Sequence, residues 1–313
     1  MKCDPIIVVS GDHKSVFLEI FFKSFKICKR PLVLIVSKKI LKQQMKLFRY
    51  KFHLNEISDL NISDIKLNNK VINFIDVPIK NMNNTKKYLE NCFHISLKIL
   101  KKNKNISLIN GPINKEKFIK NRHLGITEYL GSKTNRLKDV VMLIYNQKLS
   151  VSPITTHLPL KDVYKNISKI KIINHVKNID LFFKKHLKKK PNIAITGLNP
   201  HCESNFKKSE EKNIIIPAIN YLRKKKFRVA GPFPADTIFL QNNYKKFDVI
   251  IGMYHDQVLT PIKSIFGFNA INITLGLPFL RISPDHGPNV KMFGKNTSNP
   301  DSLREAIKFL DTK

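Results

Sequence analysis

Glycine is scarce in this sequence, and its spacing excludes two common nucleotide-binding motifs. The chain of 313 residues contains 11 glycines, and no two of them are separated by a single residue. A G-x-G-x-x-G dinucleotide fingerprint is therefore impossible, and no phosphate loop of the form G-x-x-x-x-G-K-[ST] is present. Any nucleotide must be bound in another way.

Three further absences indicate a cytoplasmic protein. No run of 18 apolar residues occurs, so no membrane span or membrane partner is expected. The N-terminal sequence MKCDPIIVVSGDHK has one short apolar run between Pro5 and Asp12, which is typical of a first strand and not of a secretion signal. The four cysteines are scattered without a C-x-x-C pair, which favours a reducing cytoplasm.

The chain is strongly basic, but the composition of its charge argues against a nucleic-acid partner. Lys and Arg together number 56, of which only 8 are Arg, and the formal net charge is +33. Asn and Ile are also abundant, and these residues share A/T-rich codons with Lys. Nucleic-acid readers favour Arg for bidentate and stacking contacts. We therefore interpret the excess as a coding bias that can still attract an anionic substrate.

Apolar runs alternate with helical patterns along the whole chain. Several runs are continuously apolar, which suits strands of a sheet covered on both faces. Strands are predicted at 6–9, 32–36, 71–75, 106–110, 139–145, 192–198, 248–254 and 269–275, and helices at 15–29, 84–102, 166–186, 209–225 and 302–310. The polar stretch 55–70 indicates a loop or an added hairpin. This alternation predicts an α/β fold with a largely parallel core.

Three histidines follow predicted strands. His157 ends the run LSVSPITT, His201 follows NIAITGL across a proline turn, and His255 follows DVIIGMY. Ligands of open α/β sheets bind beyond the carboxyl ends of the strands. Neutral imidazole is a common ligand of zinc-like metals, and three protein ligands leave one position open for catalysis. Each histidine alone could be a hydrogen-bonded loop residue, but together they favour a shared metal site.

A second group of residues is suited to binding an anion. Lys263 lies eight residues after His255, and the segment NITLGLPFLRIS carries Asn272 and Arg281. Arg281 is notable because arginine is rare here and its context is apolar. Thr127 and Glu128 follow a glycine at a probable helix start, where backbone N–H groups can also hold an anion. These residues are candidates for a phosphate or carboxylate site.

Long motifs in the second half of the chain resemble one enzyme family. They are TTHLPL (155–160), GLNPHCES (197–204), GPFPADTIF (231–239), MYHDQVLTPIK (253–263), NITLGLPFLRISPDHG (272–287) and SLREAI (302–307). Together they resemble 4-hydroxythreonine-4-phosphate dehydrogenase of pyridoxal 5'-phosphate biosynthesis. The likeness continues more thinly through SGD (10–12), NGPINK (110–115) and GITEYLG (125–131). The family has His before the matching Thr127, whereas this chain has Ile126.

The resemblance implies a fold and a set of site residues. It implies two α/β/α domains like those of isocitrate and isopropylmalate dehydrogenases, approximately 1–125 with 286–313 and 126–285, and an active-site cleft at a homodimer interface. A divalent metal (Zn, Mg or Co) would be held by His157, His201 and His255 from both subunits. Substrate contacts would come from Thr127, Lys263, Asn272 and Arg281, and the NAD(P) site from Asp285, His286, Gly287 and Asn289.

The implied reaction is oxidation and decarboxylation of 4-phosphooxy-L-threonine to 3-amino-2-oxopropyl phosphate. A metal-bound hydroxyl loses its proton, hydride passes to the nicotinamide, and CO2 leaves the β-keto acid. Asp256, Asp236 and Lys263 are the candidate acid/base groups. The alternatives are a related dehydrogenase of 4-phosphothreonate or another hydroxy acid, and, more distantly, a metal-dependent hydrolase.

Overall fold

The structure is a computed structural model that divides into two compact units. It describes residues 4–62, 65–79, 81–82, 84–103, 105–119, 123–203, 208–267, 270–284 and 287–312. Unit 1 is Met1–Arg122 with Pro278–Lys313, and unit 2 is His123–Leu277. The domain boundaries drawn from the sequence stay a prediction.

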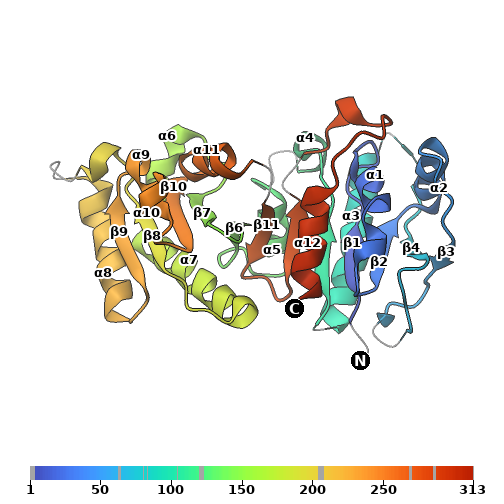
Figure 1. Cartoon of the computed structure of the whole chain (residues 1–313), viewed down its shortest axis with the longest axis horizontal. Helices are drawn as coiled ribbons and strands as arrows, with labels where there is room; N and C mark the ends of the chain where they lie inside the picture. The colour runs from blue at the N-terminus through green and yellow to red at the C-terminus, as the bar shows by residue number, and fades with distance from the viewer. Residues whose placement is uncertain are drawn as a thin grey trace. The chain divides into compact units, whose positions relative to one another are not determined.

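Unit 1 is a parallel sheet with helices between its strands (Figure 1). Its strand order is β3 (Leu54–Glu56), β4 (Ile72–Asp76), β2 (Leu32–Val36), β1 (Ile6–Val9), β5 (Ser107–Asn110) and β12 (Arg281–Pro284). The helices include α1 (Phe17–Phe22), α2 (Lys38–Leu47), α3 (Thr85–Lys102), α4 (Lys115–Phe118) and α12 (Asp301–Asp311). Every residue of β1 and β2 is buried, which explains their uninterrupted apolar sequences.

Unit 2 has a mixed sheet whose parallel half carries the three histidines. Its strand order is β11 (Ile271–Leu275), β6 (Val141–Tyr145), β7 (Ser150–Thr155), β10 (Val249–Tyr254), β8 (Ile193–Thr196) and β9 (Val229–Phe233). The β11–β6 and β6–β7 pairs are antiparallel, and the remaining pairs are parallel. The helices include α5 (Ile126–Lys133), α6 (Leu160–Val163), α7 (Lys169–Phe182), α8 (Ile216–Lys224), α9 (Ala235–Ile238), α10 (Gln241–Tyr244) and α11 (His255–Phe266).

The predicted strands are present with small changes at their ends, whereas some helices differ from the prediction. The helix predicted over 15–29 is wrong in length, because α1 ends at Phe22 and only a 3-10 turn (Phe25–Ile27) follows. Helix α2 was not predicted, because its sequence KKILKQQMKL is mostly polar and buries only four side chains. The stretch predicted as a loop or hairpin contains the end of β3, which pairs with β4 in parallel and so does not form a hairpin with it.

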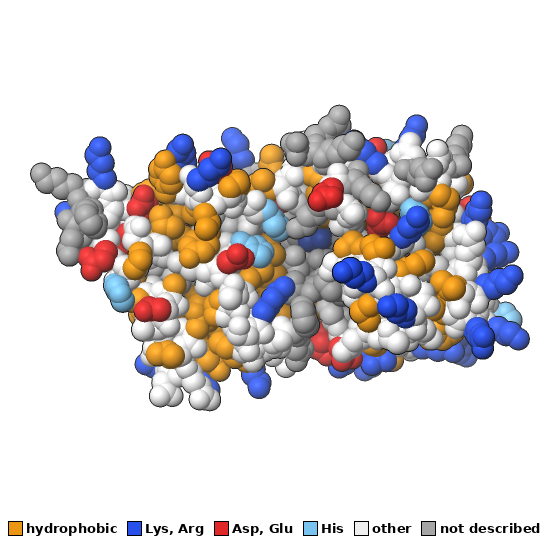
Figure 2. Space-filling view, turned by 90° about the horizontal axis from the view of Figure 1, so that it is seen from above, with side chains coloured by type: hydrophobic (Ala, Val, Ile, Leu, Met, Phe, Trp, Pro, Cys, Tyr) orange, Lys and Arg blue, Asp and Glu red, His pale blue; other side chains and the backbone are white. Residues whose placement is uncertain are grey.

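The basic side chains that the structure describes do not form one continuous stripe on the face drawn in Figure 2. Lys and Arg side chains lie singly or in small groups over the face drawn in Figure 2. Among the residues that the structure describes, no helix is long and apolar enough to cross a membrane.

Candidate functional site

The carboxyl ends of the parallel strands in unit 2 form one edge that carries all three histidines. Strand β10 lies between β7 and β8 and is parallel to both. His157 lies two residues beyond β7, His255 is the first residue of α11 directly after β10, and His201 lies five residues beyond β8. Histidine side chains reach the molecular surface in the space-filling view (Figure 2). The predicted strand-end placement of these histidines is therefore what the structure has.

His157 and His255 lie next to each other with a separation that suits a shared metal ion. Their ring centroids are 5.4 Å apart. Two imidazoles on one tetrahedral zinc-like ion have centroids about 5 Å apart, because each metal–nitrogen bond is about 2 Å long. Nδ1 of His255 lies 2.6 Å from Oδ1 of Asp256. A carboxylate on Nδ1 fixes the tautomer that presents the Nε2 lone pair to a metal. The donors present therefore fit a divalent cation.

The turn that carries His201 is held by a buried carboxylate. Oε1 of Glu211 accepts hydrogen bonds from the backbone N–H groups of Leu198 (2.7 Å) and Asn199 (2.9 Å), and Oε2 accepts from the Asn199 side chain (2.9 Å). Burial acts to raise the pKa of Glu211, but the hydrogen bonds from Asn199 and Leu198 outweigh it and lower the pKa. His201 itself is exposed and has a left-handed backbone with φ 56°. A non-glycine residue adopts that conformation only when its surroundings impose it.

Within one chain the three histidines do not form a complete set of ligands. In the part of the chain that the structure describes, no group of three or more His, Cys, Asp or Glu could hold a metal ion. His157 and His255 thus supply a pair, and the three-histidine site remains a prediction that requires a further ligand.

A small polar network lies beside His157. Oε1 of Glu128 accepts a hydrogen bond from the hydroxyl of Thr156 (2.9 Å), which directly precedes His157 in the chain. Oε2 of Glu128 is buried and has no hydrogen-bond partner among the described residues. Lys171 on α7 interacts electrostatically with Glu128; burial lowers the pKa of Lys171, and the Glu128 charge opposes that shift. One oxygen of the Glu128 carboxylate can therefore still accept a hydrogen bond.

The predicted substrate residues of unit 2 occupy three different elements. Thr127 is buried in the first turn of α5, and its hydroxyl lies 3.2 Å from that of Thr274 on β11. Asn272 is also on β11, and its side-chain oxygen is buried without a hydrogen-bond partner. Lys263 is exposed in the last turn of α11, eight residues after His255 and so about 12 Å further along the helix axis. Lys263 and His255 therefore lie near opposite ends of α11.

Arg281 belongs to unit 1, where it is almost completely buried at 3% exposure. Its Nε donates a hydrogen bond of 2.7 Å to Oδ1 of Asn110 at the end of β5. That bond fixes the orientation of the guanidinium at the carboxyl end of a parallel strand.

The three predicted acid/base groups lie at the same edge of the unit 2 sheet or on the helix that leaves it. Asp256 is exposed and contacts His255, as described above. Asp236 is exposed in the first turn of α9, close enough to the Cys202 thiol to help raise its pKa, although burial is the larger cause. Their positions suit roles beside His255 and His201, and their assignment as acid or base stays a prediction.

The segment predicted to bind the cofactor is described only in part. Asp285 and His286 lie outside the described residues, whereas Gly287 and Asn289 are exposed. The carbonyl of Pro288 accepts a hydrogen bond from Val16 (3.2 Å), and the buried carboxylate of Glu19 accepts from the backbone N–H and hydroxyl of Ser298. These bonds attach the segment to α1 within unit 1, and its contact with a nucleotide remains a prediction.

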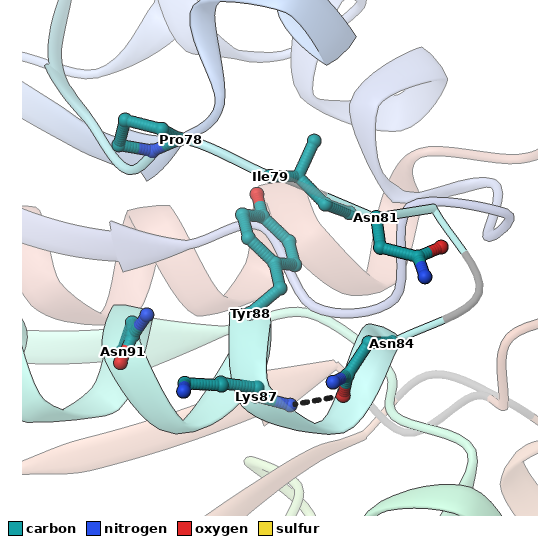
Figure 3. A pocket seen from close by; sticks show the side chains of 7 residues that line it. All are labelled: Pro78, Ile79, Asn81, Asn84, Lys87, Tyr88 and Asn91. Atoms are coloured by element: carbon teal, nitrogen blue, oxygen red, sulfur yellow. Dashed lines mark hydrogen bonds between the residues drawn. The ribbon is translucent and has the colours of Figure 1, made fainter.

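Unit 1 also has a cavity of about 410 Å³ between the segment after β4 and the first turns of α3 (Figure 3). Tyr88 points from α3 toward Ile79, and its hydroxyl accepts a hydrogen bond from the backbone N–H of Ser37 (3.1 Å). The lining residues are Pro78, Ile79, Asn81, Asn84, Lys87, Tyr88 and Asn91, none of which is among the predicted site residues.

Sequence reasoning missed three residues that support the histidines. Glu128 was noted only as part of a helix start, and neither Glu211 nor Gln257 was selected. Gln257 could have been found from the sequence HDQ, because it lies two residues after His255. Glu211 and Glu128 act on turns 12 and 28 residues away, so no local spacing identifies them.

Curated relatives match most or nearly all of this chain. A 4-hydroxythreonine-4-phosphate dehydrogenase of Sulfurihydrogenibium sp. (strain YO3AOP1) is 38% identical over 316 residues, which cover 96% of each chain. A D-threonate 4-phosphate dehydrogenase of Pectobacterium atrosepticum is 33% identical over 204 residues, covering 64% of this chain and 62% of its own.

Solved structures agree with the fold expected from the sequence. A crystal structure of 4-hydroxythreonine-4-phosphate dehydrogenase from Klebsiella pneumoniae matches with a TM-score of 0.84 at 27% identity, over 99% of both chains. An isocitrate dehydrogenase from Methylococcus capsulatus matches with a TM-score of 0.52 at 8% identity, over 96% of this chain and 83% of its own, which shows the shared fold alone. The predicted α/β fold is thereby confirmed. The family model described as pyridoxal phosphate biosynthetic protein PdxA matches residues 27–310, and the chain therefore belongs to the PdxA family.

Proposed function

We propose that this protein oxidises and decarboxylates 4-phosphooxy-L-threonine to 3-amino-2-oxopropyl phosphate, with NAD(P) as the hydride acceptor. The observation that carries the proposal is the edge of unit 2, where a chain of the PdxA family has the ring centroids of His157 and His255 5.4 Å apart. The cellular role that follows is a step in pyridoxal 5'-phosphate biosynthesis in the cytoplasm.

The chemistry needs two groups that the chain does not itself supply. A divalent cation held by His157 and His255, with His201 as a further ligand, would supply Lewis acidity at the C3 oxygen of the substrate, and NAD(P) would accept the hydride. Because one chain brings only two of the histidines together, we infer that a second subunit completes the ligand set in a homodimer.

The residues of unit 2 have distinct tasks in this reaction. The partnerless oxygen of Asn272 can accept a hydrogen bond from the substrate ammonium or hydroxyl group. The Thr127 hydroxyl can donate to a phosphate oxygen. Asp256 orients His255 through the 2.6 Å contact with Nδ1. Asp236 and Lys263 remain the candidate groups that take the C3 hydroxyl proton and return a proton to C2 after CO2 leaves.

Arg281 and Lys263 are proposed to bind the substrate phosphate. A buried guanidinium is stabilised by an anion, and the Asn110 contact on Nε orients its remaining N–H groups for bidentate binding. Gly287 and Asn289 are proposed to contact the nucleotide, together with Asp285 and His286.

The proposal is tested by following NAD(P)H formation at 340 nm with 4-phosphooxy-L-threonine, with and without a chelator. Formation of NAD(P)H and CO2 in equal amounts, abolished by the chelator and restored by a divalent metal, is the expected result. A protein that binds metal but produces no NAD(P)H with this substrate or with other 4-phosphorylated hydroxy acids would contradict the proposal and favour a hydrolase.

A second substrate is favoured by one sequence feature and one relative. Ile126, the first residue of α5, stands where the family has His, so a polar contact next to Thr127 is replaced by an apolar one. The Pectobacterium relative acts, by its name, on D-threonate 4-phosphate, which carries a hydroxyl where the aminated substrate has its ammonium. Comparing kcat/KM for the two substrates decides between them.

A further inference from the structure

The Glu128 carboxylate is held in an unusual state beside a proposed metal ligand. It lies in the first turn of α5, where the helix dipole favours a negative charge. One oxygen accepts a hydrogen bond from Thr156, and the other is buried without a partner. A buried carboxylate oxygen without a hydrogen-bond donor is costly, because it has lost its water without gaining a partner. Such a cost is compensated when the oxygen acquires a donor.

Gly125 shows what this unpartnered oxygen faces. A Cβ atom at Gly125 would lie 2.9 Å from Oε2 of Glu128 and 3.4 Å from both Cε1 and Nδ1 of His157. The Glu128 oxygen and the edge of the His157 ring thus border the same small space, and this space is open because residue 125 is a glycine and has no side chain.

We propose that Glu128 is the positioning residue of His157: its Oε2 accepts the Nδ1 hydrogen of that imidazole when Nε2 binds a divalent cation. The inference rests on the proposed metal site. Metal-binding histidines generally donate their second ring N–H to a carboxylate or carbonyl, which orients the ring and increases its basicity. Asp256 has this relation to His255 at 2.6 Å, so the two adjacent histidines would each have a carboxylate of their own.

The surroundings of Glu128 favour a role behind His157 over a direct contact with the substrate. Oε2 is inaccessible to solvent, so a bound molecule could reach it only after the helix start moved. Lys171 on α7 interacts electrostatically with the Glu128 carboxylate. Thr156 ties the carboxylate to the backbone next to His157. Each neighbour holds Glu128 toward the histidine.

The test is Co²⁺ binding to metal-free protein, measured by competition with a chromophoric chelator and by the visible absorption of Co²⁺ bound to imidazole. Glu128→Gln keeps the acceptor for Thr156 but removes the charge, and we expect its Kd for Co²⁺ to rise about 10–100-fold with an altered spectrum. Gly125→Ala should have a similar effect, because the added methyl group separates Glu128 from His157. Glu305→Gln, a surface carboxylate paired with Lys308, is the matched control and should bind Co²⁺ like the wild type.

A purely structural Glu128 would give a different pattern. Glu128→Gln and Gly125→Ala would then lower the melting temperature of the metal-free protein while Kd and spectrum stayed at their wild-type values, and this result would overturn the inference. If Glu128→Gln does not fold, Gly125→Ala and Thr156→Val carry the same comparison. Wild-type protein that binds no Co²⁺ would refute the proposed metal site itself, whereas equal binding by wild type and variants refutes only the role of Glu128.

Discussion

His175 makes the stability of unit 2 depend on pH in a way that can be measured. This side chain is 4% exposed on α7, and its Nε2 donates a hydrogen bond of 3.2 Å to the carbonyl of Pro153 on β7. Burial is the main cause that lowers the pKa of His175 from 6.5 to about 3, and the Lys171 charge adds to it, while the bond to Pro153 opposes the shift. His175 is therefore neutral in the folded protein at any ordinary pH.

The sign and the size of the effect follow from the two pKa values. Between pH 6.5 and about 3 the unfolded chain binds a proton at this position and the folded chain does not, so stability falls as the pH falls through this window. At pH 5.0 the loss relative to pH 7.5 is about 2 kcal/mol, and it approaches about 5 kcal/mol only below pH 3.

The perturbation is His175→Gln, which keeps an N–H donor for the Pro153 carbonyl but cannot titrate. Urea unfolding at pH 7.5 and pH 5.0, followed by circular dichroism, gives the free energy of unfolding for each protein. We expect the wild type to lose about 2 kcal/mol more than the variant between these pH values, whatever the variant's absolute stability. His94→Gln, on the exposed face of α3, controls for the general effect of replacing a histidine. Parallel pH dependences of wild type and His175→Gln would refute the reasoning.

Two further predictions concern groups with definite hydrogen-bond partners. Glu211→Gln should lower the free energy of unfolding at pH 7 by roughly 2–3 kcal/mol in urea unfolding, because an amide cannot accept all the hydrogen bonds from Leu198 and Asn199. Since the pKa of Glu211 is lowered below 4.5, the difference in stability between wild type and variant should shrink as the pH falls below 4.5. A difference that stays constant with pH would contradict this prediction. Arg281→Lys should raise KM for the phosphorylated substrate about tenfold or more and leave KM for NAD nearly unchanged, because an ammonium group cannot reproduce a bidentate contact. A lowered melting temperature with an unchanged substrate KM would instead show that Arg281 only stabilises the structure through its hydrogen bond to Asn110.

The sequence predicted eight strands and the strand-end histidines because both depend on local pattern, whereas β3, β7, β9 and β12 were not among the predicted strands. A continuous apolar run such as the one before His255 has only one suitable environment, a strand buried on both faces, and the polar residue after it must lie at the sheet edge. Helix α2 was missed although its buried residues Ile40, Leu41 and Met45 recur at helical spacing, because the sequence around them is short and mostly polar.

The order of strands in the sheet could not be predicted, and the site depends on it. Chain order runs β7, β8, β9, β10, but β10 lies between β7 and β8, which places His255 beside His157. Long-range pairings of this kind are decided by tertiary packing. The contacts of Glu128 with Thr156 and of Glu211 with Leu198 join residues 28 and 13 positions apart, so they too were inaccessible from local spacing.

Gln257 joins the end of the strand that leads to His255 to the end of the strand that leads to His201. Its Oε1 accepts hydrogen bonds from the backbone of Met253 (2.6 Å) and the hydroxyl of Thr196 (2.9 Å), and its Nε2 donates to the carbonyl of Gly197 (2.7 Å). One buried amide thus joins the end of β10 to the end of β8. A Cβ atom at Gly252 would lie 3.0 Å from Oε1 of Gln257, so the glycine in this strand leaves room for the amide.

Three consecutive residues therefore perform three linked tasks at the end of one strand. His255 presents a ring nitrogen at the sheet edge, Asp256 fixes the tautomer of that ring, and Gln257 anchors the turn to the strand that leads to His201. A neutral, fully bonded amide suits the anchor better than a charge would, because it satisfies two donors and one acceptor in the core without a desolvation cost for an ion. The division of tasks also explains the exposure of the three side chains: Gln257 is buried, His255 is half-buried and Asp256 is exposed.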